Sequence, residues 1–218
     1  MRLPTGKAVL FDLLTALLDS WTTWNHAAGG ETAGRQWRTR YLQLTYGCGP
    51  YRPYEELVRA AAVDVGLNPG AADRLESCWL TLEPWSGATE AILVLATHHP
   101  VGIVTNCSMR LGRLAAQRLP VDWRVIVTAE EAGYYKPHPR PYELALERLG
   151  VSATQALFVA GSGYDLFGTA AVGLPTYWHN RMGLAAPPGS PAPQVEARDF
   201  DSLTAWVDAH RTREPLPR

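Results

Sequence analysis

Apolar residues occur along this chain in short, unbroken runs and do not alternate with polar residues. A short unbroken run is typical of a strand that is buried on both faces, as strands in parallel sheets are. The four strongest runs are Ala8–Phe11, Val101–Thr105, Val125–Thr128 and Ala156–Ala160. Weaker runs predict a short strand at Pro175–His179 and a last strand at Val195–Phe200.

Segments in which apolar residues recur with helical spacing separate these runs. They are Thr89–Thr97, Arg110–Arg118, Arg140–Leu149 and Leu166–Val172. Strand and helix patterns that alternate in this way predict an α/β fold with a doubly wound parallel sheet. Residues 185–193 are expected to form a surface loop, residues 201–204 to cap a short closing helix, and residues 213–218 to fray.

One long stretch interrupts the alternation. Between residues 18 and 86 no run predicts a strand, and the helical patterns include Glu55–Val65 and Ala72–Leu82. We therefore expect two domains, an α/β core made of residues 1–17 and 87–218 and a helical cap made of residues 18–86. Five of the eight tryptophans fall in this stretch, and we interpret most of them as packing residues of a small subdomain.

Composition and charge narrow the class of partner. The 218 residues are 46% apolar and 19% charged, which is ordinary for a globular protein. The 20 basic residues nearly balance the 21 acidic ones, so no overall field favours nucleic acid or an anionic membrane. We expect a small-molecule substrate, with no nucleic-acid or membrane partner, and the sequence is compatible with a homodimer.

The cysteines bear on the cellular compartment. Cys48, Cys78 and Cys107 show neither metal-ligand nor CxxC spacing, which suits free thiols in a reducing compartment. No apolar run reaches the ~18 residues that a membrane span needs. Asp12 also interrupts the apolar segment near the amino terminus, so this segment is not expected to be a signal peptide. Together these features predict a cytoplasmic protein.

Polar residues stand where the predicted strands end, and ligands of parallel sheets bind at these carboxyl ends. Asp12 follows the first strand, and Thr105 and Asn106 end the second. Lys136 lies in the loop after the third strand, and Asp165 comes just after the fourth. This pattern predicts a nucleophilic carboxylate beside a cation and a second acid.

Four segments carry these residues: Phe11–Asp19, Ile103–Asn106, Gly133–Tyr142 and Leu157–Asp165. In this order they resemble the motifs of the haloacid dehalogenase superfamily, and the resemblance covers nearly the whole chain. It implies a core sheet with Asp12 as the nucleophile, a helical cap inserted after the first motif, and Lys136 beside the nucleophile. In this reading Asp165 orients Lys136 or the hydrolytic water.

The same segments distinguish between branches of this superfamily. Its phosphatases carry one acid two residues after the nucleophile and another early in the fourth motif, where it binds magnesium. The corresponding residues here are Leu14 and Ala160. Because Mg²⁺ needs oxygen ligands, we expect neither a metal nor another cofactor.

The chain is more similar to the metal-independent 2-haloacid dehalogenases. Trp37–Gln43 resembles the segment that supplies their halide-facing arginine, which maps onto Arg38. Tyr142 matches a functional position in their third motif. The resemblance implies hydrolytic removal of the halogen from a short 2-haloacid, through an ester on Asp12 that water then cleaves.

Further site residues follow from the same resemblance. Thr105 and Asn106 would hold the carboxylate of the substrate. The main-chain amides of Leu13 and Leu14 would help to stabilise the oxyanion that forms when the ester is hydrolysed. Ser162 in the fourth motif would contribute to substrate binding.

The chain departs from the dehalogenase pattern at several hydroxyl and amide positions. Ala16 stands where threonine is expected, Ala160 where serine is expected, and Ser162 where asparagine is expected. The lost hydroxyls would remove hydrogen bonds that orient the carboxylate or the water. Two alternatives therefore stay open: a phosphate-ester hydrolase with a weakened metal site, and a catalytically silent member that binds a small acid or a partner protein.

Overall fold

The computed structural model describes residues 7–68 and 70–210, so the predicted frayed end at 213–218 lies outside the described residues. One parallel sheet contains six strands in the order β3-β2-β1-β4-β5-β6. The strands are β1 (Ala8–Phe11), β2 (Val101–Thr105), β3 (Val125–Thr128), β4 (Ala156–Ala160), β5 (Thr176–His179) and β6 (Val195–Ala197). The predicted doubly wound α/β sheet is confirmed, because β1 lies in its middle and the chain winds outward from it in both directions.

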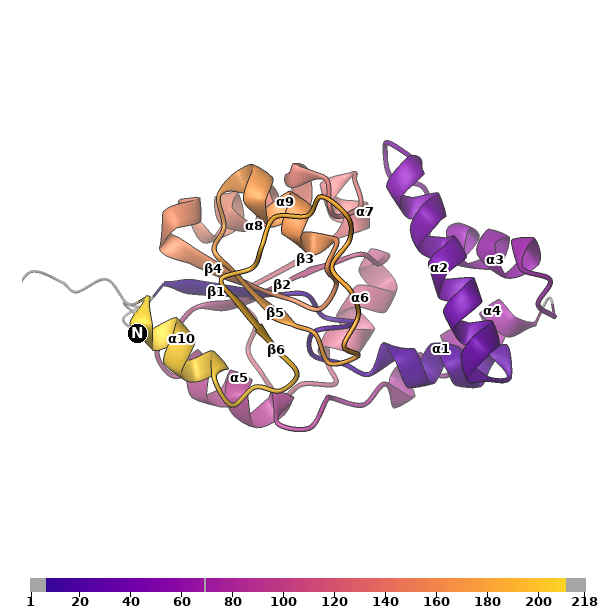
Figure 1. Cartoon of the computed structure of the whole chain (residues 1–218), viewed down its shortest axis with the longest axis horizontal. Coiled ribbons are helices and arrows are strands. Elements are labelled where there is room, and N and C mark those ends of the chain that lie inside the picture. The colour runs from indigo at the N-terminus through magenta and orange to yellow at the C-terminus, as the bar shows by residue number, and fades with distance from the viewer. Residues whose placement is uncertain (1–6, 69, 211–218) are drawn as a thin grey trace, which may run out of the picture.

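Helices cover both faces of the sheet (Figure 1). One face packs against α5 (Ala88–Ala96), α6 (Met109–Ala116) and α10 (Leu203–Ala209). The opposite face packs against α8 (Pro139–Leu149) and α9 (Asp165–Val172). Successive residues of β1 contribute to the two cores in turn, which explains why its sequence is apolar without a break.

The long stretch after β1 folds into helices that lie beyond the carboxyl ends of the strands (Figure 1). These helices, which we call the helical insert, are α1 (Ser20–Ala28), α2 (Glu31–Gly47), α3 (Tyr54–Asp64), α4 (Ala71–Ser77) and the short 3₁₀ helix η1 (Trp79–Thr81). Polar contacts join the insert to the sheet layer. The hydroxyl of Tyr135 donates to the carbonyl of Arg52 at 2.8 Å, and the indole of Trp79 donates to the carbonyl of Leu111 at 2.8 Å.

Three local predictions differ from the structure. The helix expected at Ala72–Leu82 is broken, because α4 ends at Ser77 and the tighter turn of η1 directs the Trp79 indole into the core. The edge strand expected at Val195–Phe200 ends at Ala197. The helix α7 (Ala129–Ala132) and the 3₁₀ helix η2 (Ala153–Gln155) were not expected. Each spans only about one turn, so it leaves no repeating apolar pattern in the sequence.

Candidate active site

Asp12 is the first residue after β1, and the turn that follows directs main-chain amides back onto its carboxylate. The Oδ2 atom accepts hydrogen bonds from the Thr15 amide at 2.9 Å, the Thr15 hydroxyl at 2.6 Å and the Ala16 amide at 3.1 Å. Three donors fill the acceptor capacity of this oxygen. Oδ1 is therefore the oxygen that keeps a lone pair for chemistry.

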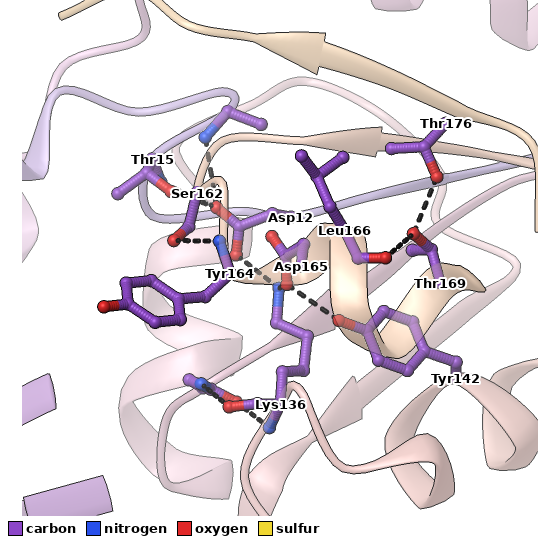
Figure 2. A network of polar contacts seen from close by, with 12 residues as sticks. Asp12, Thr15, Lys136, Tyr142, Ser162, Tyr164, Asp165, Leu166, Thr169 and Thr176 are labelled. Atoms are coloured by element: carbon purple, nitrogen blue, oxygen red, sulfur yellow. Dashed lines mark hydrogen bonds and ion pairs between the residues drawn. The ribbon is translucent and has the colours of Figure 1, made fainter. Parts of the chain in front are cut away.

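Lys136 lies between two carboxylates, as Figure 2 shows. Its Nζ is 2.8 Å from Oδ1 of Asp12 and 3.0 Å from Oδ1 of Asp165. Tyr142 donates its hydroxyl to the same Asp165 oxygen at 2.8 Å. All four side chains are buried, so these contacts form a closed polar network inside an apolar layer.

Asn106 fixes the main chain that carries Lys136. Its side-chain amide donates to the Lys136 carbonyl at 2.9 Å and accepts from the Lys136 amide at 2.7 Å. Both ends of the Asn106 amide are thus engaged with the protein. This pairing holds the loop after β3 against the end of β2 and points the lysine toward Asp12.

The two carboxylates respond differently to the same lysine. Burial would raise the pKa of Asp12, but the charge of Lys136 and the hydrogen bonds from Lys136 and Thr15 outweigh burial and lower it. Burial raises the pKa of Asp165, and the charge of Asp12 adds to this effect against the attraction of Lys136. Burial would lower the pKa of Lys136, but the two acids raise it. Asp12 is consequently held ionised, and Asp165 is the better proton acceptor of the pair.

The second carboxylate oxygen of Asp165 lies outside these pairings. Oδ2 is buried and makes no hydrogen bond within the part of the chain that the structure describes. A buried, unsatisfied carboxylate oxygen is costly and seeks a donor. A water molecule or a polar group of a bound substrate would satisfy it.

Arg38 faces this network from the helical insert. Its guanidinium carbon lies 4.2 Å from the centre of the Trp21 ring and 5.7 Å from that of Trp24, and its Nη1 donates to the Ser20 hydroxyl at 3.0 Å. Burial lowers the pKa of Arg38, but a guanidinium keeps its proton in proteins. No carboxylate pairs with it among residues 7–68 and 70–210, so the position favours an anionic ligand.

A cavity of about 130 Å³ lies between the network and the insert. Asp12, Lys136 and Asp165 form its charged floor, and Arg38 with aromatic rings forms its roof. Its aromatic lining consists of Trp21, Trp24, Tyr41, Tyr46, Tyr54, Tyr164 and Trp178. Most of the wall is thus apolar, with a few convergent charges, which is typical of a site for a small organic anion.

The structure brings most of the predicted site residues to this cavity. Those that line it are Asp12, Leu14, Arg38, Asn106, Lys136, Ser162 and Asp165. Leu13, Thr105 and Tyr142 are buried behind it and are absent from its lining. The Thr105 hydroxyl is buried without a partner in the described ranges.

The donors at the nucleophile differ from the predicted ones. The expected amides were those of Leu13 and Leu14, whereas the amides that bond to the carboxylate belong to Thr15 and Ala16. The hydroxyl that seemed lost at Ala16 is supplied from the preceding position by Thr15. Sequence could name Thr15 as a neighbour, but only the path of the turn shows that its hydroxyl points at Asp12.

A close approach explains the glycine at the end of β4. A Cβ atom added to Gly161 would overlap the main chain of Thr15 and Ala16. Glycine therefore lets the loop after β4 pack directly against the nucleophile turn. This contact holds Asp12 and Asp165 at a common edge of the sheet.

Three further observations concern the described residues. No group of three or more His, Cys, Asp and Glu side chains is arranged to hold a metal ion in residues 7–68 and 70–210. In the same part of the chain, no helix combines the length and the apolar character that crossing a membrane requires. The three cysteines are free, and Cys107 is buried.

Comparisons with known proteins show the family and the fold. Residues 6–173 match the family model of haloacid dehalogenase-like hydrolases. The chain is 25% identical to an (S)-2-haloacid dehalogenase of Pseudomonas fluorescens, over 84% of this chain and 86% of that protein. It is 26% identical to an (S)-2-haloacid dehalogenase of Pseudomonas sp. strain YL, over 94% of this chain and 95% of the other. The crystal structure of a dehalogenase superposes with a TM-score of 0.79 at 25% identity, covering 94% of this chain and 98% of that one.

Proposed function

The chain belongs to the haloacid dehalogenase-like hydrolases, and from this premise we propose that it hydrolyses short 2-haloacids to 2-hydroxy acids through an ester on Asp12. We also propose that residues 18–86 act as a cap over a core made of residues 1–17 and 87–218. One observation carries the proposal. Asp12 lines a small aromatic cavity with Oδ1 held only by Lys136, and the same cavity is lined by Arg38, which pairs with no carboxylate of the described residues.

The size of the cavity supports a short substrate. An apolar cavity of ~150 Å³ holds a benzene molecule. 2-Chloropropionate has as many non-hydrogen atoms as benzene, and the cavity here measures about 130 Å³. A three-carbon haloacid therefore fits in contact with Asp12.

In the first step, Oδ1 of Asp12 attacks the carbon that bears the halogen. The new carbon–oxygen bond forms as the carbon–halogen bond breaks, so the halide leaves with its electron pair and the carbon inverts. The low pKa of Asp12 keeps the nucleophile ionised, and Lys136 orients its oxygen. Arg38 receives the departing halide, because it has no carboxylate partner in the described chain.

In the second step, water attacks the carbonyl carbon of the Asp12 ester. Charge develops on Oδ2, where the hydroxyl and amide of Thr15 and the amide of Ala16 already point. These donors make a preformed oxyanion hole. Asp165 takes the proton from the water, since its Oδ2 is free and its pKa is raised. The bond between Cγ and Oδ1 of Asp12 then breaks, and the leaving alkoxide takes the proton from Asp165, so the 2-hydroxy acid departs with Oδ1. The second proton of the attacking water goes to solvent, and Asp12 is regenerated as a carboxylate.

Asn106 and Tyr142 act indirectly in this proposal. Asn106 holds the main chain of Lys136, and Tyr142 holds Asp165. Both are therefore positioning residues. Ser162 lines the cavity beside Asp165 and is available to the substrate carboxylate.

A panel assay tests the proposed function against its alternatives. Halide release is measured with chloro and bromo derivatives of acetate and propionate, and phosphate release with small phosphate esters, each with and without a chelator. We expect halide release from the haloacids that persists in the chelator. Phosphate release that depends on added magnesium would favour the phosphatase, and no turnover of any compound would favour a binding protein.

A further inference from the structure

We infer that the loop between β5 and β6 forms an apolar entrance that receives the alkyl tail of the substrate and so sets its chain length. The inference rests on the proposed function and extends it. We call Tyr46, Tyr164, Leu184 and Pro187 the entrance collar. All four line the same cavity as Asp12.

The exposed fraction of the lining residues locates the opening. Asp12, Lys136 and Asp165 are at most 5% exposed, whereas Tyr164 is 39% and Leu184 is 38% exposed. Of the large apolar side chains that are this exposed in the described residues, these two line the cavity that contains Asp12. The cavity therefore opens to solvent between the loop after β4 and the loop before β6.

Hydrogen bonds from a buried side chain hold the rim of this opening in place. Asn180 is 3% exposed, and its side-chain amide donates to the Leu184 carbonyl at 2.8 Å. It also accepts from the Leu184 amide at 2.9 Å and donates to the Glu196 carboxylate at 2.6 Å. This buried clamp fixes Leu184 at the opening.

Two close contacts complete the collar. A Cβ atom added to Gly163 would lie 2.6 Å from Cδ of Pro187, so glycine lets the β5–β6 loop pack onto the loop after β4. On the other side, the rings of Tyr46 and Tyr164 lie 4.5 Å apart between centres. This contact closes the collar with a side chain from α2. In Figure 1 the loop before β6 reaches toward the side of the sheet that faces the insert.

The collar predicts how a substrate that is longer than the cavity binds. The cavity measures about 130 Å³ and a three-carbon haloacid takes up most of it, so further methylenes extend toward the opening. There it would contact Leu184 and the tyrosine rings instead of water. Burial of a methylene improves affinity about three- to fourfold. Longer 2-haloalkanoates should therefore be better substrates than 2-halopropionate.

Chain-length selectivity provides the test. The kcat/KM of halide release is measured for 2-bromopropionate, 2-bromobutanoate and 2-bromohexanoate. We expect wild type to gain about threefold per methylene, and Leu184→Ala to reduce the hexanoate-to-propionate ratio at least fivefold. Leu184→Met, which conserves volume, should keep the ratio within about twofold. Leu80→Ala, which truncates an exposed leucine outside this cavity, should leave the ratio unchanged.

Binding of unhalogenated acids separates this inference from the proposed function. Quenching of tryptophan fluorescence reports the binding of hexanoate and propionate, because Trp21, Trp24 and Trp178 line the cavity. Tighter binding of hexanoate by wild type and a smaller advantage in Leu184→Ala would support the collar even if no halide is released. A wild-type preference for the shorter acid, or a ratio that Leu184→Ala does not change, would overturn it.

Discussion

The carboxyl edge of the sheet and the helical insert line the same cavity with different chemistry. The sheet edge contributes two carboxylates, Asp12 and Asp165, that share the single cation of Lys136, so one negative charge is left over when both are ionised. The insert contributes one cation, Arg38, held by indole rings and a serine hydroxyl. The difference assigns bond making to the sheet edge, where the nucleophile lies beside its cation, and recognition of an anion to the insert, where Arg38 has no carboxylate partner among the described residues.

Removal of Lys136 should cause the largest loss of activity and stability at the sheet edge. Lys136→Ala leaves two buried carboxylates without a cation, which costs ~3–5 kcal/mol of folding free energy and raises the pKa of Asp12. We expect kcat to fall by about a thousandfold or more in the halide-release assay. Lys136→Arg should not restore activity, because a planar guanidinium is wider than an ammonium group.

Lys7→Ala is the matched control for this variant, since Lys7 is the other lysine of the chain and is absent from the cavity lining. It should keep both the activity and the melting temperature of wild type. A Lys136→Ala protein that turns over at the wild-type rate would remove Lys136 from the mechanism.

Loss of Arg38 should damage recognition rather than folding. Arg38→Ala removes the guanidinium with which the insert lines the cavity, and we expect kcat/KM to fall by about a hundredfold with a change in melting temperature of only a few degrees. Arg35→Ala is the control, because Arg35 is exposed and pairs with Glu31 on the surface of the same helix. Equal losses in the two variants would contradict the assignment of anion binding to Arg38.

Sequence predicts the positions of the residues at the strand ends better than those of residues in the turns and loops, for a physical reason. Buried parallel strands have unbroken apolar runs, and their topology forces Asp12, Lys136 and Asp165 to one edge, so motif order predicts that they meet. The direction of the Thr15 hydroxyl depends on the exact path of a turn. The place of Leu184 depends on a buried clamp to Asn180. Neither leaves a periodic pattern in the sequence.

The Thr15 hydroxyl offers a finer test of the sheet edge. Thr15→Ala removes one of the three donors to Oδ2 of Asp12, and we expect kcat to fall by about tenfold while the two main-chain donors remain. Thr15→Ser keeps the hydroxyl and should recover most of the activity. Rapid-quench measurements should show that hydrolysis of the ester slows more than its formation. Slower ester formation with unchanged hydrolysis would argue against an oxyanion hole at Thr15.

The pH profile should show the smallest effect, a broad plateau. The lowered pKa of Asp12 keeps it ionised, so the acid limb of kcat follows Asp165, which acts in ester hydrolysis and whose pKa is raised. The raised pKa of Lys136 keeps it charged to beyond the ordinary lysine value of ~10.4. We therefore expect kcat to fall on the acid side at a pH above the ordinary Asp value of ~3.9 and to stay level on the basic side to beyond ~10.4. Stability from Lys136 is likewise present below the ordinary lysine pKa and lost as the pH rises through the raised one. A basic limb near neutral pH would indicate that another group controls the reaction.

The origin of the oxygen in the product tests the covalent mechanism most directly. Enzyme in excess over 2-chloropropionate is allowed one turnover in water labelled with heavy oxygen, and both the product and the peptide that contains Asp12 are analysed by mass spectrometry. Because water attacks the ester carbonyl, the first turnover should place heavy oxygen in Asp12 and leave the 2-hydroxy acid unlabelled. A labelled product together with an unlabelled Asp12 would mean that water attacks the substrate directly, and it would contradict the proposed role of Asp12.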